Sequence, residues 1–149
     1  MDKSFLSGFR HRTFIQIRFK DVDKMGHVNN ANHLTYFELA RMGYFREVIS
    51  EPIDWSRDGI ILARAEIDYR LPVLLDDDVR VWCRIGKLGK TSFDFIYAMT
   101  AVRHDTEVIL AEGRSVQVCF NYELNKPVEI PSSWRRKVLE YEDPLFLSV

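Results

Sequence analysis

One long helical segment, from about residue 30 to residue 50, sets the strongest limit on how this chain can fold. On a helical wheel of about 100° per residue, one broad face of the segment is apolar. That face is formed by Leu34, Phe37, Met42, Tyr44, Phe45, Val48 and Ile49. Because Tyr36, Leu39 and Ala40 fall outside it, the segment is apolar over much of its circumference. The pattern predicts a helix enclosed by a sheet.

The rest of the chain contains the strands that such a sheet needs. A strand-like segment at 14–19 precedes the helix, and four more follow it, at 60–70, 78–87, 92–103 and 107–121. Alternation is clearest at 78–87, where Val79, Val81, Cys83 and Ile85 share one face. A short tail helix is predicted to begin near Pro131. This order predicts an α+β domain spanning 1–149, with a long antiparallel β-sheet.

Composition and charge argue against several classes of function. The formal net charge is −1, and acidic and basic residues are interspersed, which gives no electrostatic basis for binding nucleic acid or a membrane surface. No apolar run approaches the roughly 20 residues of a membrane span. The two cysteines, Cys83 and Cys119, lie far apart and are expected to be reduced core thiols. These features predict a soluble, cytoplasmic protein.

The polar loop ahead of the long helix carries the residues most suited to chemistry. It contains Asp21, Asp23, Gly26, His27, Asn29 and Asn30. A carboxylate beside a helix N-terminus can attack a carbonyl or activate water, while free backbone N–H groups receive the oxyanion. An aspartate here can also simply shape a turn or cap the helix. No group of His, Cys, Asp or Glu has convincing metal-ligand spacing, so no metal site is expected.

This loop and the helix after it resemble the 4-hydroxybenzoyl-CoA thioesterase family of hotdog-fold thioesterases. The matching positions are Asp21, Asp23, Gly26, Val28, Ala31, Tyr36, Phe37, Glu38, Ala40 and Arg41. The resemblance implies a hotdog fold, in which a long antiparallel sheet wraps around a central helix. It also implies a homodimer or tetramer with active sites at the subunit interface. His33 is a departure, because the family often has tyrosine there.

The resemblance assigns Asp23 as the catalytic carboxylate and the Asn30 backbone amide as the group that polarises the thioester carbonyl. Asp21 is expected to be a structural loop residue. The expected substrate-binding residues are His27, Asn29, Leu34, Phe37, Lys90, Thr91 and Ser92. The last three lie in a turn that, in the family, is near the nucleotide end of coenzyme A, although an ordinary polar hairpin is equally consistent with them.

Glu38 is the alternative catalytic acid, because other hotdog branches use an acid on the central helix. The simpler interpretation is that Glu38 forms an i,i+3 ion pair with Arg41. The remaining histidines, His11, His33 and His104, are expected at the surface or, for His33, at an interface.

The resemblance implies an acyl-CoA thioesterase, and the His27-Val28-Asn29-Asn30 form together with the apolar helix favours hydrolysis of medium- to long-chain fatty acyl-CoA to free acid and coenzyme A. Because coenzyme A is part of the substrate, no separate cofactor is expected. An acyl-carrier-protein thioesterase and a non-catalytic acyl-thioester binding protein remain alternatives, since fold does not determine function.

Overall fold

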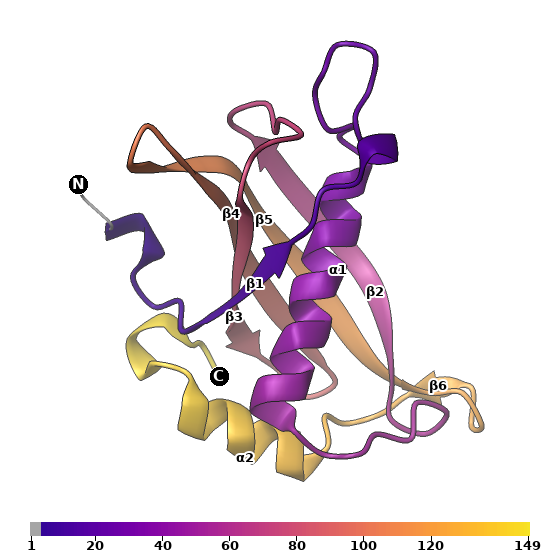
Figure 1. Ribbon diagram of the computed structural model, residues 1–149. Helices are drawn as coiled ribbons and strands as arrows, with labels where there is room; N and C mark the ends of the chain where they lie inside the picture. The colour runs from indigo at the N-terminus through magenta and orange to yellow at the C-terminus, as the bar shows by residue number, and fades with distance from the viewer. Residues whose placement is uncertain (1–3) are drawn as a thin grey trace.

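The computed structural model describes residues 4–149 as an antiparallel sheet with one long helix across its face (Figure 1). The strand order is β1 (His11–Ile15), β3 (Val79–Leu88), β4 (Ser92–Arg103), β5 (Thr106–Asn121) and β2 (Gly59–Tyr69), and the short β6 (Lys126–Pro127) pairs antiparallel with the end of β5. Helix α1 (Asn32–Tyr44) continues as the π-helical turn η3 (Phe45–Ile49), and α2 (Ser132–Tyr141) follows the sheet. Three single 3₁₀ turns complete the structure: η1 (Ser4–Leu6), η2 (Phe19–Asp21) and η4 (Pro144–Phe146). The predicted α+β class is confirmed.

The four long strands lie within one or two residues of their predicted bounds, but the first strand does not. β1 occupies residues 11–15 instead of 14–19, and the chain turns through η2 before it reaches the polar loop. The sequence pattern missed this because Phe14 and Phe19, which suggested a strand, are both exposed. The long helix also begins two residues later than predicted, since Asn30 and Ala31 form a turn ahead of α1.

Aromatic side chains fill the space between α1 and the sheet. The ring of Phe37 stacks on Tyr97 of β4 with 4.3 Å between ring centroids, and Tyr44 meets Phe95 edge-on at 5.1 Å. Gly113 of β5 allows this close approach, because a Cβ atom at that position would collide with the Phe37 ring. The helix is therefore held against the sheet by packing that places its N-terminus at one end of the strands.

A buried carboxylate fastens the C-terminal segment to this core. Glu142, just after α2, accepts hydrogen bonds from Tyr44 Oη at 2.7 Å and from the Ile85 amide at 2.9 Å. Burial raises the pKa of Glu142 even though these two hydrogen bonds favour the ionised form. Ionisation of Glu142 in the folded protein therefore costs stability.

We expect the stability of the Glu142→Gln protein to increase relative to that of the wild type as pH rises. The folded-state pKa lies above the unfolded one, so the wild type loses stability as pH rises from the unfolded value through the folded value. The glutamine carbonyl can accept the same two hydrogen bonds without carrying a charge.

Melting temperatures of both proteins between mildly acidic and slightly alkaline pH measure this trend. Glu140→Gln is a matched control, because Glu140 is an exposed residue of the same helix. A melting-temperature difference between Glu142→Gln and the wild type that does not change with pH would contradict the assignment.

Candidate active site

The loop that carries Asp23 is a tight turn closed by its own backbone. The Asp23 amide donates to the His27 carbonyl at 2.8 Å, and the Gly26 amide donates to the Asp23 carbonyl at 3.0 Å. Gly26 has φ +80°, a left-handed conformation that glycine adopts without strain. Asp23 Oδ1 accepts from the amides of Met25 at 2.9 Å and His27 at 3.2 Å. The carboxylate is thus held by one oxygen, and its other oxygen has no hydrogen-bond partner within residues 4–149.

Asp21 anchors the same loop from beneath. Its carboxylate is buried and accepts hydrogen bonds from Tyr36 Oη at 2.8 Å and from Arg18 at 2.9 Å. Burial by itself would raise the pKa of Asp21, but the hydrogen bonds from Arg18 and Tyr36 lower it below its ordinary value. Its carbonyl oxygen accepts from the Asn29 amide at 2.8 Å. Asp21 is therefore placed to support the loop rather than to meet a substrate.

The start of α1 presents a free backbone amide. The Ala31 amide donates to Asn29 Oδ1 at 3.0 Å, which satisfies one of the N–H groups at the helix start. The Asn30 amide, in contrast, finds no acceptor among the described residues. Tyr69 Oη of β2 donates to the Asn30 carbonyl at 3.2 Å and helps to orient the residue. A free N–H at the positive end of the helix dipole suits a developing negative charge.

These groups surround one open cleft of about 450 Å³. Its lining residues are Asp23, Met25, His27, Val28, Asn30, His33, Tyr69, Arg70, Leu71, Pro72 and Val73. The structure therefore brings together Asp23, His27 and Asn30, as the sequence predicted. Asn29 does not line the cleft, but its side chain shapes the turn beside it.

His33 is not at the helix surface, one of its two predicted places, since it is only 3% exposed and lines the cleft. The ring contacts Tyr69 edge-on at 4.9 Å, and its Nδ1 has no hydrogen-bond partner within residues 4–149. Burial lowers the pKa of His33, so the imidazole is neutral near pH 7. His11 is likewise buried, with Nδ1 bonded to Glu47 at 2.7 Å. Only the replacement of the family's tyrosine signalled that His33 could matter.

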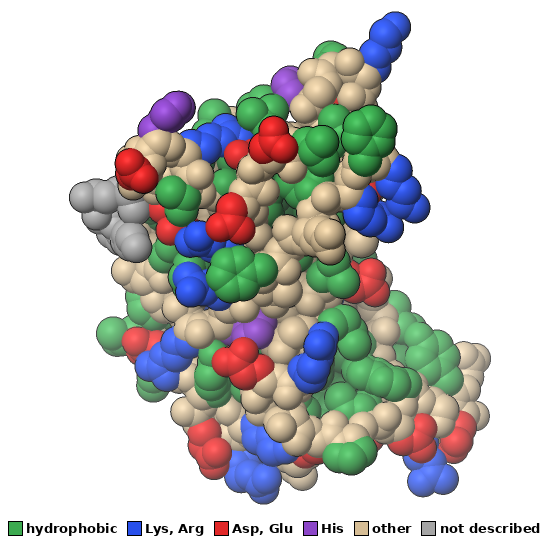
Figure 2. All heavy atoms as spheres, viewed as in Figure 1, with side chains coloured by type: hydrophobic (Ala, Val, Ile, Leu, Met, Phe, Trp, Pro, Cys, Tyr) green, Lys and Arg blue, Asp and Glu red, His purple; other side chains and the backbone are tan. Residues whose placement is uncertain are grey.

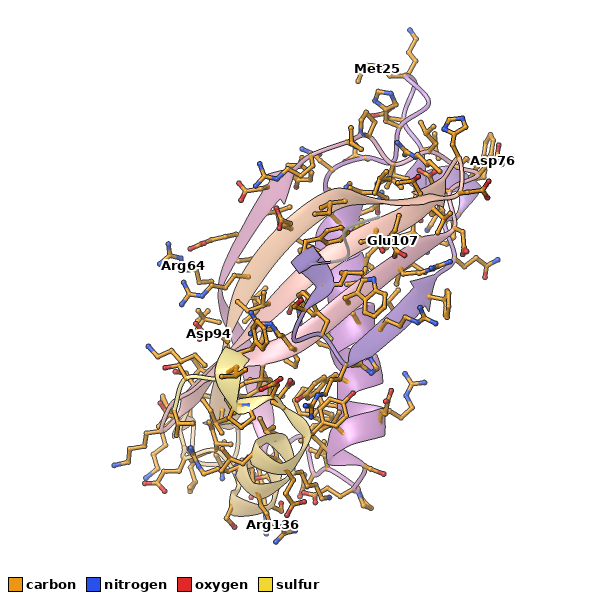
Figure 3. The ribbon with its side chains drawn as sticks, turned by 90° about the vertical axis from the view of Figure 1, so that its left-hand side faces the viewer. Met25, Arg64, Asp76, Asp94, Glu107 and Arg136 are labelled. Atoms are coloured by element: carbon orange, nitrogen blue, oxygen red, sulfur yellow. The ribbon has the colours of Figure 1, made fainter. Side chains whose placement is uncertain are left out.

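Several expected binding residues lie elsewhere. Phe37 is fully buried against Tyr97, and Leu34 is 42% exposed; neither lines the cleft. The turn of Lys90, Thr91 and Ser92 lies at the opposite end of the sheet. Ser92 is level with Val118 of β5 and Tyr69 is level with Ala111, so the two ends are roughly 23 Å apart at about 3.3 Å per residue. In Figure 3, Met25 lies at one end of the molecule and Arg136 of α2 at the other, and its neighbour Arg135 donates to the Gly89 carbonyl.

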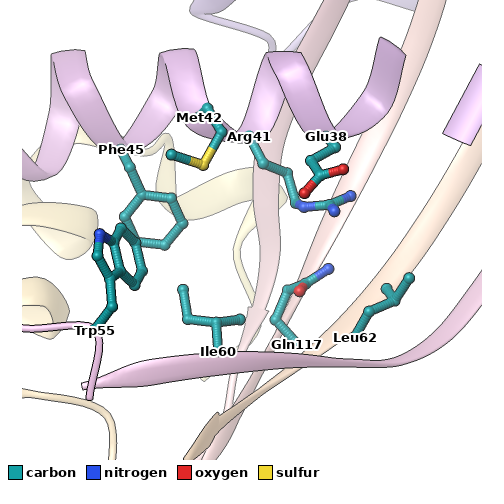
Figure 4. Close-up of a pocket in the computed structure, with 8 residues that line it drawn as sticks. All are labelled: Glu38, Arg41, Met42, Phe45, Trp55, Ile60, Leu62 and Gln117. Atoms are coloured by element: carbon teal, nitrogen blue, oxygen red, sulfur yellow. The ribbon is translucent and has the colours of Figure 1, made fainter. Parts of the chain in front are cut away.

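A second cavity, of about 240 Å³, lies between α1 and the start of β2 (Figure 4). Its lining residues are Glu38, Arg41, Met42, Phe45, Trp55, Ile60, Leu62 and Gln117. Glu38 therefore belongs to this cavity and not to the cleft of Asp23. Arg41 donates to Tyr97 Oη at 3.0 Å instead of forming the expected ion pair with Glu38. Sequence reasoning missed Trp55, which lies in a loop, and Gln117, which lies on a strand.

The structure also bears on metal binding and membrane insertion. Within residues 4–149, no group of three or more His, Cys, Asp and Glu side chains is arranged to hold a metal ion. None of the helices in that range has the length and apolar character to cross a bilayer.

Comparison with known proteins identifies the family to which this arrangement belongs. The profile of the thioesterase-like superfamily matches residues 17–138, which include both the cleft and the second cavity. A thioesterase from Thermus thermophilus, complexed with coenzyme A and Zn, is 36% identical and superposes with a TM-score of 0.76, covering 90% of this chain and 95% of that one. The hotdog resemblance is confirmed.

Two further relatives are less similar to this chain in sequence. The long-chain acyl-CoA thioesterase FadM of Escherichia coli (strain K12) is 24% identical over 131 residues, 85% of this chain and 96% of FadM. The uncharacterized protein YsmA of Bacillus subtilis (strain 168) is 25% identical over 83 residues. The match spans 56% of this chain and 56% of YsmA.

Proposed function

This chain is a thioester hydrolase of the thioesterase-like superfamily, and we propose that its substrates are acyl thioesters of coenzyme A with medium- to long-chain fatty acyl groups. One observation carries the proposal. The same cleft holds the Asp23 carboxylate, with one oxygen not hydrogen-bonded, and the Asn30 amide beside the start of α1, which has no acceptor among the described residues. A carboxylate and an oxyanion donor are the minimum that acyl transfer to water requires.

In this mechanism the thioester carbonyl oxygen points at the Asn30 amide. Asp23 takes a proton from water as the water oxygen attacks the carbonyl carbon, and negative charge develops on the carbonyl oxygen. The C–S bond then breaks, and the departing coenzyme A thiolate takes up the proton that Asp23 received from water. Direct attack by Asp23, followed by hydrolysis of the resulting anhydride, leads to the same products. Asp21 supports both routes by holding the loop.

The fatty-acyl preference rests on the face of α1 that follows Asn30. Leu34, Arg41 and Phe45 recur there at helical spacing, and Arg41 and Phe45 line the second cavity together with the apolar side chains of Met42, Trp55, Ile60 and Leu62. On the face seen in Figure 2, hydrophobic side chains gather where α1 ends and β2 begins. Met42, Trp55 and Leu62 are exposed there by 43%, 43% and 45%. An acyl chain laid along this face would remove those surfaces from water.

We expect kcat/KM to rise from acetyl-CoA through the medium-chain to the long-chain acyl-CoA substrates and then to level off. Each methylene that leaves water contributes about 0.8 kcal/mol, so four additional carbons add about 3 kcal/mol. Release of free thiol from each substrate measures the series. Best activity on acetyl-CoA, or on a benzoyl-type thioester with no gain along the fatty series, would remove the fatty-acyl proposal.

We expect Asp23→Asn to lower kcat at least ~100-fold, the scale of losing a general base. The asparagine carbonyl can still accept from the amides of Met25 and His27, so the melting temperature should change little. Glu38→Gln is the matched comparison, because Glu38 lies six residues into α1 from Asn32, roughly 9 Å along the helix axis, and lines the second cavity instead of the cleft. Near-normal turnover of Asp23→Asn together with an inactive Glu38→Gln would transfer the catalytic role to the helix acid.

The enzyme assembles at least as a homodimer through the edge of β2. Among residues 4–149 this strand pairs with β5 alone, and Leu62 and Tyr69 on it are 45% and 51% exposed. An unpaired edge of such length favours pairing with another strand. Antiparallel pairing of two β2 edges would bring the Lys90–Ser92 turn of one protomer to the end of the sheet that carries Asp23 in its partner. The two halves of the expected coenzyme A site would then meet.

Sedimentation equilibrium at micromolar concentration should give at least twice the 17.6 kDa mass of one chain. Arg64→Glu places a like charge beside Glu66 on the β2 edge and should weaken the dimer at least tenfold, because a two-fold interface repeats each charge. Arg12→Glu, on the opposite edge strand β1, is the control and should leave the mass unchanged. A fully active monomer would refute the assembly.

A further inference from the structure

A network of buried polar side chains reaches the second cavity through Gln117 and Arg41, the two members that line it. Tyr97, Ser115 and Gln117 are exposed by only 1%, 2% and 2%, respectively. Tyr97 Oη and Ser115 Oγ lie 2.6 Å apart, Gln117 Nε2 donates to Ser115 Oγ at 2.9 Å, and Arg41 donates to Tyr97 Oη at 3.0 Å. Such a network is costly in an otherwise apolar cavity unless its groups are satisfied.

Two members of this network keep unused hydrogen-bonding capacity on the cavity side. The Gln117 side-chain amide donates a hydrogen bond to Ser115. Its carbonyl oxygen has no hydrogen-bond partner in the part of the chain that the structure describes. Arg41 donates from one guanidinium nitrogen to Tyr97 and has further N–H donors. Figure 4 shows the Gln117 amide pointing toward Arg41 across the cavity. An acceptor and a donor therefore face the same space.

The charges around that space select a neutral ligand group. Glu38 and Arg41 carry opposite charges and line the same cavity. A ligand carboxylate would be attracted by Arg41 but repelled by Glu38, and a ligand ammonium group would meet the reverse, so the cavity favours neither charge. A hydroxyl can donate to Gln117 and accept from Arg41 at once, and a keto oxygen can accept from Arg41. A saturated methylene chain would leave both groups unsatisfied.

The position of the network along α1 locates this oxygen within an acyl chain. Asn30 lies just ahead of α1, and Arg41 lies nine residues into it from Asn32, roughly 14 Å along the axis at about 1.5 Å per residue, with helical side chains leaning toward the N-terminus. Beyond Gln117 and Arg41, which form the polar set of the cavity, the walls become apolar at Met42, Phe45 and Trp55. A chain whose carbonyl lies at Asn30 would thus meet polar groups partway along and apolar groups at its end.

We propose that the second cavity binds aliphatic acyl chains at a hydroxyl or keto group carried within the chain, with Gln117 and Arg41 as the residues that recognise this oxygen. The preferred substrates are oxygenated fatty acyl thioesters. This inference rests on the proposed acyl-CoA hydrolase function and names the substrate class of the same site.

The test measures binding to the Asp23→Asn protein, so that turnover does not consume the probes. Calorimetric titrations compare dodecanoyl-CoA with a set of hydroxydodecanoyl-CoA isomers that carry one hydroxyl at successive positions. At least one isomer with an internal hydroxyl should bind about tenfold more tightly than dodecanoyl-CoA, the scale of one or two buried hydrogen bonds. Adding Gln117→Met should abolish that preference.

Met42→Leu is the matched control in the same cavity, because it changes apolar shape without changing the polar set, and it should preserve the preference. If Gln117→Met fails to fold, as judged by its thermal melt, Arg41→Met carries the same expectation from the opposite wall. The inference is overturned if no isomer binds more tightly than dodecanoyl-CoA, if no probe binds, or if the preference survives both substitutions. Thiol release from dodecanoyl-CoA by the wild type tests the hydrolase function separately.

Discussion

The buried carboxylate of Asp21 is the interaction on which the cleft depends. A charged group with so little exposure persists only because Arg18 and Tyr36 hydrogen-bond to it, and together these contacts tie the loop to α1. Its backbone carbonyl fixes Asn29 as well. The loop that follows is therefore fixed at its base, and this holds Asp23 and Asn30 where both line one cleft. Oxyanion stabilisation needs such preorganisation, because a donor that must reorient contributes little.

Helix α1 serves two purposes on different sides of its surface. One side packs Phe37 and Tyr44 into the sheet and holds the helix in place. Another side starts next to the free Asn30 amide and carries Glu38 and Arg41, which line the second cavity. The rigid packing of the first side determines where the second presents its groups. Gly113 is part of this arrangement, because only a residue without Cβ lets the helix lie so close to β5.

The single chain leaves two features incomplete. The β2 edge has no partner among the described residues, and the Lys90–Ser92 turn lies at the end of the sheet away from Asp23. A two-fold antiparallel pairing of β2 edges resolves both at once, since it completes the ladder and reverses the direction of one protomer relative to the other. The proposed dimer is thus a consequence of strand order, in which the long edge strand is the one that ends at the cleft.

The sequence by itself predicted most of the elements and singled out Asp23, His27 and Asn30 in one loop, and all three line the cleft. Alternation at β3 and the apolar circumference of α1 predicted the sheet and the enclosed helix, because side-chain periodicity depends on local backbone geometry. The motif around Asp23 and Asn30 predicted which groups would meet, since they are close in the chain. Only the tertiary structure decided that His33 is buried, that Phe37 belongs to the core, and that Glu38 and Gln117 share a cavity. Gln117 lies 79 positions after Glu38, so no local pattern relates them. Such contacts arise from the way the sheet curls around α1, and that curvature is a property of the whole packed domain.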